Sequence, residues 1–265
     1  MLTLIILCVI IFALAIVMTM AGRGGGNFYV LVLALSGVPM HQAATTGQFI
    51  LFMTAISALF VFQKNKVVVW PLAILIGTLT ASAALAGGYF SHWFSGFTLK
   101  LIFSCLLAIA GAMMLLPVSE RTNLNPDRKL GYWIFESGGS RYIVNLWIAT
   151  SVTILAGFGS GMVGVSGGSF LVPLMVLACG VPMRVAVGTA STLIAATALM
   201  GFTGHALQGD FNPAWAVPLA GVTVIGGFLG SKFAMKTKSK SLKQLFAYTT
   251  LAASIFMVIN AFYSR

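Results

Sequence analysis

The stretch that decides the fold is residues 164–173, Gly-Val-Ser-Gly-Gly-Ser-Phe-Leu-Val-Pro, which interrupts an otherwise apolar part of the chain. A Gly-Val-Pro turn follows at residues 180–182. The first half of the chain carries a looser copy, with a glycine break at residues 22–26 and a second Gly-Val-Pro turn at residues 37–39. Paired broken segments in corresponding halves of an apolar chain indicate the binding site of a transporter.

The composition is that of an integral membrane protein. Of 265 residues, 59% are hydrophobic and only 7% are charged, whereas soluble domains carry about 25% charged residues. The acidic residues all lie in polar connections: Glu120, Asp127, Glu136 and Asp210. Carboxylates inside membrane spans are the usual proton relays and cation sites of transporters, and the sequence predicts none. The basic residues cluster in short loops, which indicates topology and lipid contact rather than nucleic-acid binding.

Each half contains four long apolar segments and one that is too short to cross a bilayer as a helix, which needs about 20 residues. The short segments are residues 28–36 and 169–179. The long segments are residues 1–20, 47–62, 67–87 and 97–117, then 142–163, 185–204, 214–233 and 245–262. Residues 1–20 lack the basic start of a signal peptide, so we expect a retained helix. The sequence predicts an all-α polytopic membrane protein with about eight full transmembrane helices and two short, broken half-helices.

The polar connection 118–141 divides one membrane domain into two repeats, residues 1–117 and 142–265. Its basic residues place this linker in the cytoplasm. If each short segment turns the chain back, each half makes an odd number of passes. The halves then have opposite orientations, and both termini are periplasmic. This inverted repeat gathers the basic loops on the cytoplasmic side, which a parallel repeat does less well.

The two glycine breaks are the predicted binding elements. Helix breaks in a membrane are tolerated only where protein or water surrounds them. A short helix that starts at a break exposes unpaired N–H groups at the positive end of its dipole, which suits an anion. The residues concerned are Gly167, Gly168 and Ser169 in the second half, and Gly25, Gly26 and Asn27 in the first. Ser169 and Asn27 are also good N-caps, and the sequence leaves the two roles equally open.

A polar cluster follows each Gly-Val-Pro turn. Thr46 and Gln48 lie near the start of one span, and Thr189 and Ser191 near the start of the other. Hydroxyl groups in membrane helices commonly bond their own backbone or a neighbouring helix, so packing is the favoured interpretation for each of them. Gln48 is bulkier and harder to hide, which favours a position facing the transport pathway.

Other polar residues have a plain alternative to a functional role. Arg23 lies inside the first break, where its charge would suit an anion, but the charge rule favours a cytoplasmic arginine that snorkels to the interface. Arg184 is interpreted as a topology signal. His92 and His205 end spans. Cys8, Cys105 and Cys179 are interpreted as small hydrophobic filler, and Cys179, which lies beside the second break, is the one for which a functional role stays more open. Glycines at 157, 159, 161, 221, 226, 227 and 230 are expected to let helices pack closely.

The motif at residues 164–173, the turn at 180–182, Ala-Val-Gly-Thr at 186–189 and the glycine-rich span 221–230 resemble the sulfite exporter TauE/SafE family, also called TSUP. The resemblance covers essentially the whole chain and is looser in the first half, where Arg23 replaces an apolar residue and Thr45 stands where glycine would precede threonine. It implies a multi-pass transporter of small sulfur-containing anions in the bacterial inner membrane. Sulfite, sulfoacetate and isethionate are such anions.

The function expected from these observations is secondary transport of an anion by alternating access between the two halves. The sequence has no P-loop, so the chain itself does not hydrolyse ATP, and a proton or sodium gradient is left open as the driving force. A passive anion channel and a carrier of organic carboxylates are the alternatives. An enzyme is disfavoured, because no metal cluster, activated nucleophile or cofactor motif occurs. No cofactor is expected, and homo-oligomer formation is left open.

Overall fold

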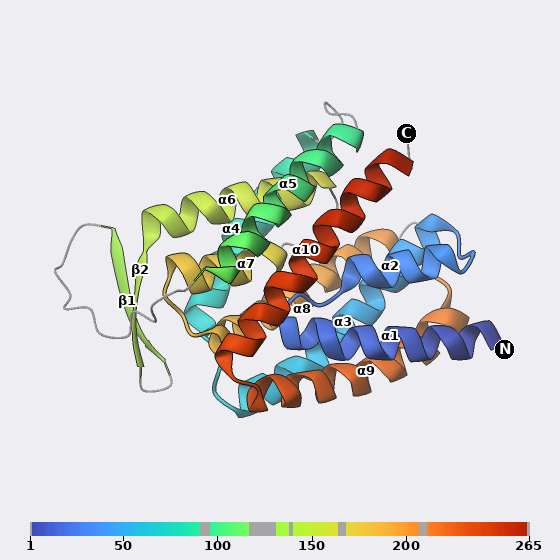
Figure 1. Cartoon of the computed structure of the whole chain (residues 1–265), viewed down its shortest axis with the longest axis horizontal. Coiled ribbons are helices and arrows are strands. Elements are labelled where there is room, and N and C mark those ends of the chain that lie inside the picture. Colours follow the sequence, from blue (N-terminus) through green and yellow to red (C-terminus); the bar gives the residue numbers. More distant parts are fainter. Residues whose placement is uncertain are drawn as a thin grey trace.

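A computed structural model describes residues 2–90, 96–116, 131–137, 140–163, 168–206 and 211–263 (Figure 1). The elements of the first half are α1 Leu2–Ala21, α2 Gly26–Leu35, α3 Met40–Lys64, α4 Trp70–Phe90 and α5 Gly96–Leu115. A hairpin of β1 Tyr132–Ser137 and β2 Ser140–Asn145 follows. The second half contains α6 Leu146–Val163, α7 Gly168–Pro173, the π-helical segment η2 Leu174–Ala178, α8 Met183–Ala206, α9 Pro213–Lys236 and α10 Ser239–Tyr263.

The prediction of a helical membrane protein is confirmed. Within the described ranges, five helical segments are long and apolar enough to cross a membrane: Thr3–Ala21, Gln42–Lys64, Met183–Thr203, Pro213–Lys236 and Ser239–Phe262. Shorter apolar stretches lie in α2, α4, α5 and α6. The count of about eight full spans stays a prediction, because these shorter stretches are not by themselves long enough to decide it.

The polar connection between the halves corrects the expectation of an all-α chain. Strands β1 and β2 pair antiparallel, with Trp133 opposite Val144, and the hairpin projects from one end of the helices (Figure 1). Residues 142–145 are therefore strand, and the helix predicted from residue 142 begins at Leu146. Asn145 fixes this start, because its Oδ1 accepts hydrogen bonds from the N–H groups of Trp147 at 3.1 Å and Ile148 at 3.4 Å.

Four helix pairs have the symmetry expected of the predicted duplication. Helix α1 packs along α9, α4 along α6, α3 along α8 and α5 along α10. When the halves are exchanged, α1 takes the place of α6 and α9 takes the place of α4. The α1–α9 pair then becomes the α6–α4 pair. The same exchange maps each of the other two pairs onto itself, but α3 also packs along α9, and the matching pair, α8 with α4, makes much less contact. Such exchange symmetry is expected of an internal repeat, and the inverted orientation of the two repeats stays a prediction.

Glycines let the paired helices approach closely, as predicted. A Cβ at Gly227 on α9 would lie 2.6 Å from the carbonyl oxygen of Thr54 on α3, and one at Gly230 would lie 2.6 Å from that of Ile16 on α1. Gly157 on α6 makes the same kind of approach to α4. The packing interpretation is confirmed for these positions. It is wrong for Gly221, where a Cβ would meet nothing within 4 Å.

We predict that Gly227→Ala destabilises the protein and Gly221→Ala does not. The added methyl group at Gly227 would overlap Ser57 Oγ at 2.5 Å and the Thr54 carbonyl at 2.6 Å. Overpacking of this kind costs about 1–3 kcal/mol. Thermal unfolding of both variants in the same detergent measures the difference. Equal unfolding midpoints would show that α9 and α3 can move apart without loss of stability.

Candidate anion-binding site

The end of α1 places Arg23 at the first break. The N–H of Arg23 donates to the Met18 carbonyl at 3.1 Å, and that of Gly22 donates to the Thr19 carbonyl at 3.0 Å. This pair of bonds is a Schellman motif, which requires a left-handed residue after the helix. Gly22 supplies it with φ 72°. The chain turns sharply here, and Arg23 is the first residue beyond the turn.

The break itself is wedged between helices of both halves. A Cβ at Gly22 would lie 3.0 Å from Cγ2 of Val187 on α8. One at Gly24 would lie 2.6 Å from Leu51 on α3 and 2.8 Å from Ile194 on α8. Both glycines also have a positive φ, so only glycine satisfies the backbone conformation and the available space together. The break is therefore held in place by residues of α3 and α8.

The short helices begin earlier than predicted, which changes the roles of two residues. Helix α2 starts at Gly26, and its N-cap is Gly25, with φ 78° and no side-chain hydrogen bond. Asn27 therefore lies inside the first turn, and the N-cap interpretation for it is wrong. Helix α7 starts at Gly168, so Ser169 likewise lies inside the first turn. Gly167 lies outside the described residues.

A direct contact joins the two breaks. Arg23 donates to Ser169 Oγ from Nε at 3.2 Å and from Nη2 at 2.9 Å, across 146 residues of sequence. The Arg23 and Ser169 side chains are only 5% and 4% exposed. The guanidinium carbon lies 6.0 Å from the centre of the Phe246 ring on α10. Arg23 thus lies inside the protein and does not snorkel to a surface.

Among the residues that the structure describes, Arg23 has no charged partner. Its partner is a hydroxyl group, and its Nη1 atom is buried without a hydrogen-bond partner in the part of the chain that the structure describes. Arginine stays protonated in proteins, and an unpaired buried charge is strongly destabilising. Glu136 lies on the hairpin strand β1, and the other three acidic residues lie outside the described ranges. An anion bound at Nη1 would supply the missing charge.

The hydroxyl groups in the polar clusters after the turns differ in whether they have a hydrogen-bond partner among the described residues. Thr189 Oγ1 accepts from the N–H of Val69 at 3.1 Å and so supports the start of α4. Ser191 Oγ donates to the Val187 carbonyl of its own helix at 3.0 Å. These two have the packing role that membrane hydroxyls usually take. Thr46 Oγ1 is buried and has no partner among the described residues.

The remaining predicted residues are placed as follows. Gln48 on α3 is half-buried, and its side chain lies 3.0 Å from the position of a Cβ on Gly201 of α8. Arg184 donates from Nη2 to the Thr237 carbonyl at 2.7 Å and ties α8 to the end of α9. His92 lies outside the described residues, as does the side chain of His205.

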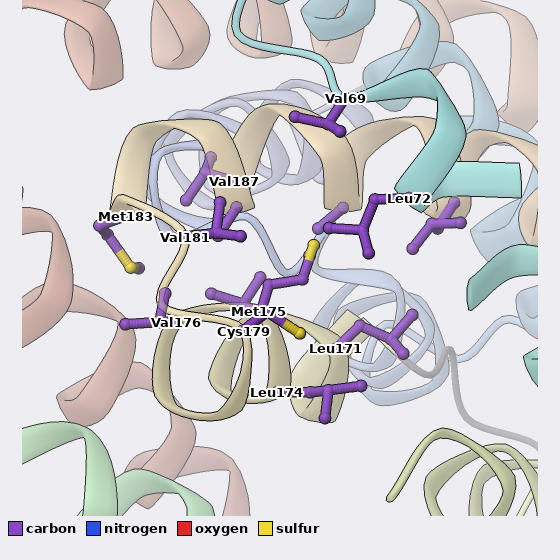
Figure 2. Close-up of a cluster of buried hydrophobic side chains, with 14 of the residues drawn as sticks. Val69, Leu72, Leu171, Leu174, Met175, Val176, Cys179, Val181, Met183 and Val187 are labelled. Atoms are coloured by element: carbon purple, nitrogen blue, oxygen red, sulfur yellow. The ribbon is translucent and has the colours of Figure 1, made fainter. Parts of the chain in front are cut away.

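Cys179 has the filler role that the sequence predicts. It is buried at 3% exposure in the cluster that fills the space between η2 and α8. Figure 2 shows its side chain among Leu171, Met175 and Val181. Phe246, by contrast, was missed, because an aromatic residue in an apolar helix gives no sign that it will meet a cation.

A cavity of about 400 Å³ lies at the other end of the short helix from Ser169. Its walls come from Met114 on α5, Val176 on η2, the turn at residues 180–183 and the start of α10. Lys240 and Lys243 line it and make it positively charged. Seven residues separate Ser169 from Val176, which corresponds to about 10 Å along a helix.

Paired broken helices that meet at a buried charge are the organisation of a membrane transporter. The chain belongs to the sulfite exporter TauE/SafE family, whose family model matches residues 7–257. It is 21% identical to the probable membrane transporter protein YunE of Bacillus subtilis, over 93% of this chain and 94% of the relative.

A second probable membrane transporter protein, from Xylella fastidiosa, is 24% identical over 89% of this chain and 87% of its own length. YdhB of Bacillus subtilis, also a probable membrane transporter protein, is 20% identical over 96% of this chain and 99% of its own length. No solved structure gives a significant match. The resemblance found in the sequence is thus confirmed at the level of the family.

We predict that Ser169→Ala destabilises the protein more than Ser191→Ala. The first change removes the acceptor of two Arg23 donors, and a hydrogen bond to a charged group is worth about 1.5–3 kcal/mol. The second removes a bond within one helix, so its effect is about 0.5 kcal/mol or less. Thermal unfolding of the purified variants compares them. Similar midpoints would mean that the Arg23–Ser169 contact does not hold the halves together.

Proposed function

We propose that the protein is a secondary carrier that moves small sulfur-containing anions across the bacterial inner membrane. Sulfite and sulfonates such as sulfoacetate or isethionate are the proposed substrates, in keeping with the family to which the chain belongs. The observation that carries the proposal is the buried Arg23 guanidinium, whose Nη1 has no described partner. A guanidinium group offers a planar set of N–H donors that matches the oxygens of an oxyanion.

The proposed mechanism is alternating access between two inverted repeats, residues 1–117 and 142–265, with the linker 118–141 in the cytoplasm and both termini in the periplasm. Arg23 belongs to the first repeat and Ser169 to the second. A movement of one repeat against the other would change this contact, so the anion and Ser169 Oγ would compete for the same donors. Substrate sites at repeat interfaces are typical of carriers with inverted repeats.

The proposed binding residues surround this contact. Arg23, Ser169 and Gly168 would form its centre, with Gly25, Gly26 and Asn27 at the start of α2. The Thr46 hydroxyl group has no hydrogen-bond partner among the described residues, and we propose that Thr46 and Gln48 lie on the pathway. Thr189 and Ser191 support the surrounding helices through their own hydrogen bonds. Gly167 completes the set by its position in the sequence.

We predict that sulfur anions raise the unfolding temperature of the wild-type protein and that Arg23→Gln removes the shift. A ligand at a hundred times its Kd adds about 2.7 kcal/mol to folded-state stability. Arg23→Lys should keep a reduced shift, because it retains the charge but not the fork of donors. Arg184→Gln is the matched control, since that arginine bonds a loop carbonyl. Shifts with carboxylates alone would contradict the proposed substrates.

Uptake into proteoliposomes separates a carrier from a passive channel. A carrier must reorient for each anion, so its initial rate saturates and unlabelled anion on the far side accelerates exchange. A rate that stays linear in substrate concentration, without exchange acceleration, would favour the channel.

We also propose that the lysine-lined cavity gives access to Arg23 from the cytoplasmic side. Phe246 lies one helical turn beyond Lys243 and covers the guanidinium. Positively charged clefts raise the local concentration of anions at low ionic strength. We predict that Lys240→Gln with Lys243→Gln raises the apparent KM about tenfold in low salt and much less in high salt.

The matched control is Lys64→Gln with Lys236→Gln, two exposed lysines that do not line the cavity. This pair removes the same charge from the same predicted side of the membrane. Equal KM values for both double variants would show that the cavity has no part in access.

A further inference from the structure

Among the residues that the structure describes, the proposed site contains a single charge. Arg23 is the only charged side chain among the buried residues that the structure describes. The other buried polar groups are hydroxyl groups of serine, threonine and Tyr29. Arginine keeps its proton at all physiological pH values, so its contribution to the site is one fixed positive charge.

The charge of the ligand then decides the charge of the loaded site. An anion with one negative charge neutralises Arg23 and leaves the site neutral. An anion with two negative charges leaves one of them buried without a partner, which is strongly unfavourable. Hydroxyl groups such as Thr46, which has no described partner, can donate hydrogen bonds to the anion, but they add no positive charge.

We propose that the site selects oxyanions with one negative charge and discriminates against divalent ones. This inference rests on the proposed function and narrows it. Among the proposed substrates it favours isethionate over sulfoacetate, which carries a carboxylate in addition to its sulfonate. It also favours the singly protonated form of sulfite, which would carry its proton through the membrane with it.

The test compares ligands that differ in charge and little else. Isethionate and sulfoacetate are both two-carbon sulfonates, ending in a hydroxyl group and a carboxylate respectively. Methanesulfonate and sulfate form a second pair of similar size. Binding of each to the purified full-length protein is measured by calorimetry at fixed pH and ionic strength. We expect the monovalent member of each pair to bind on the order of 100-fold more tightly.

Variants at Arg23 show whether this residue is the source of the preference. Arg23→Lys should keep the preference for the monovalent anion at a reduced affinity. Arg23→Gln should lose binding of both members of each pair. If Arg23→Gln does not fold, the wild-type comparison and Arg23→Lys still decide the question.

Equal affinities within both pairs, or tighter binding of sulfoacetate and sulfate, would overturn the inference while leaving sulfur-anion binding intact. A monovalent preference that survives in Arg23→Gln would overturn it as well, because the selecting charge would then lie elsewhere. Failure of all four anions to bind the wild-type protein would overturn the proposed function, and the inference with it.

Discussion

The buried guanidinium of Arg23 is the interaction on which the structure depends. It connects the end of α1 to the start of α7 through Ser169 and lies against Phe246 of α10. In a low-dielectric interior a charge that lacks a partner is costly, and a hydroxyl group compensates only part of that cost. We propose that an anion compensates the rest of that cost, at the junction of the two halves.

Backbone geometry makes this place available. The Schellman motif at the end of α1 turns the chain at Gly22, and Gly24 fits between α3 and α8 only because it has no Cβ. Similar close approaches at Gly227 and Gly230 bring α9 against α3 and α1. Glycine thus has two functions here. It breaks helices where the anion would bind, and it lets intact helices pack around the breaks.

The two halves of the chain correspond in part of their packing and differ in their chemistry. Four helix pairs map onto one another when the halves are exchanged, whereas α3 with α9 has no matching pair of similar extent. Only the first half carries an arginine in its break. Thr189 supports the start of α4. Thr46 takes the corresponding place after the other turn, and its hydroxyl group has no partner in the part of the chain that the structure describes. A repeated scaffold can therefore present one asymmetric site, because side chains diverge while helix contacts stay constrained.

The sequence by itself determined the membrane class, the family, the short helices and the two breaks, because hydropathy and glycine content are local properties of the chain. It did not predict the hairpin, since residues 142–145 are as apolar as the helix that follows, nor the helix starts that moved Asn27 and Ser169 inside the first turn. Only the tertiary structure decided that Arg23 is buried. That outcome depends on a contact with Ser169 across 146 residues, and no local pattern carries information about a partner so distant in sequence.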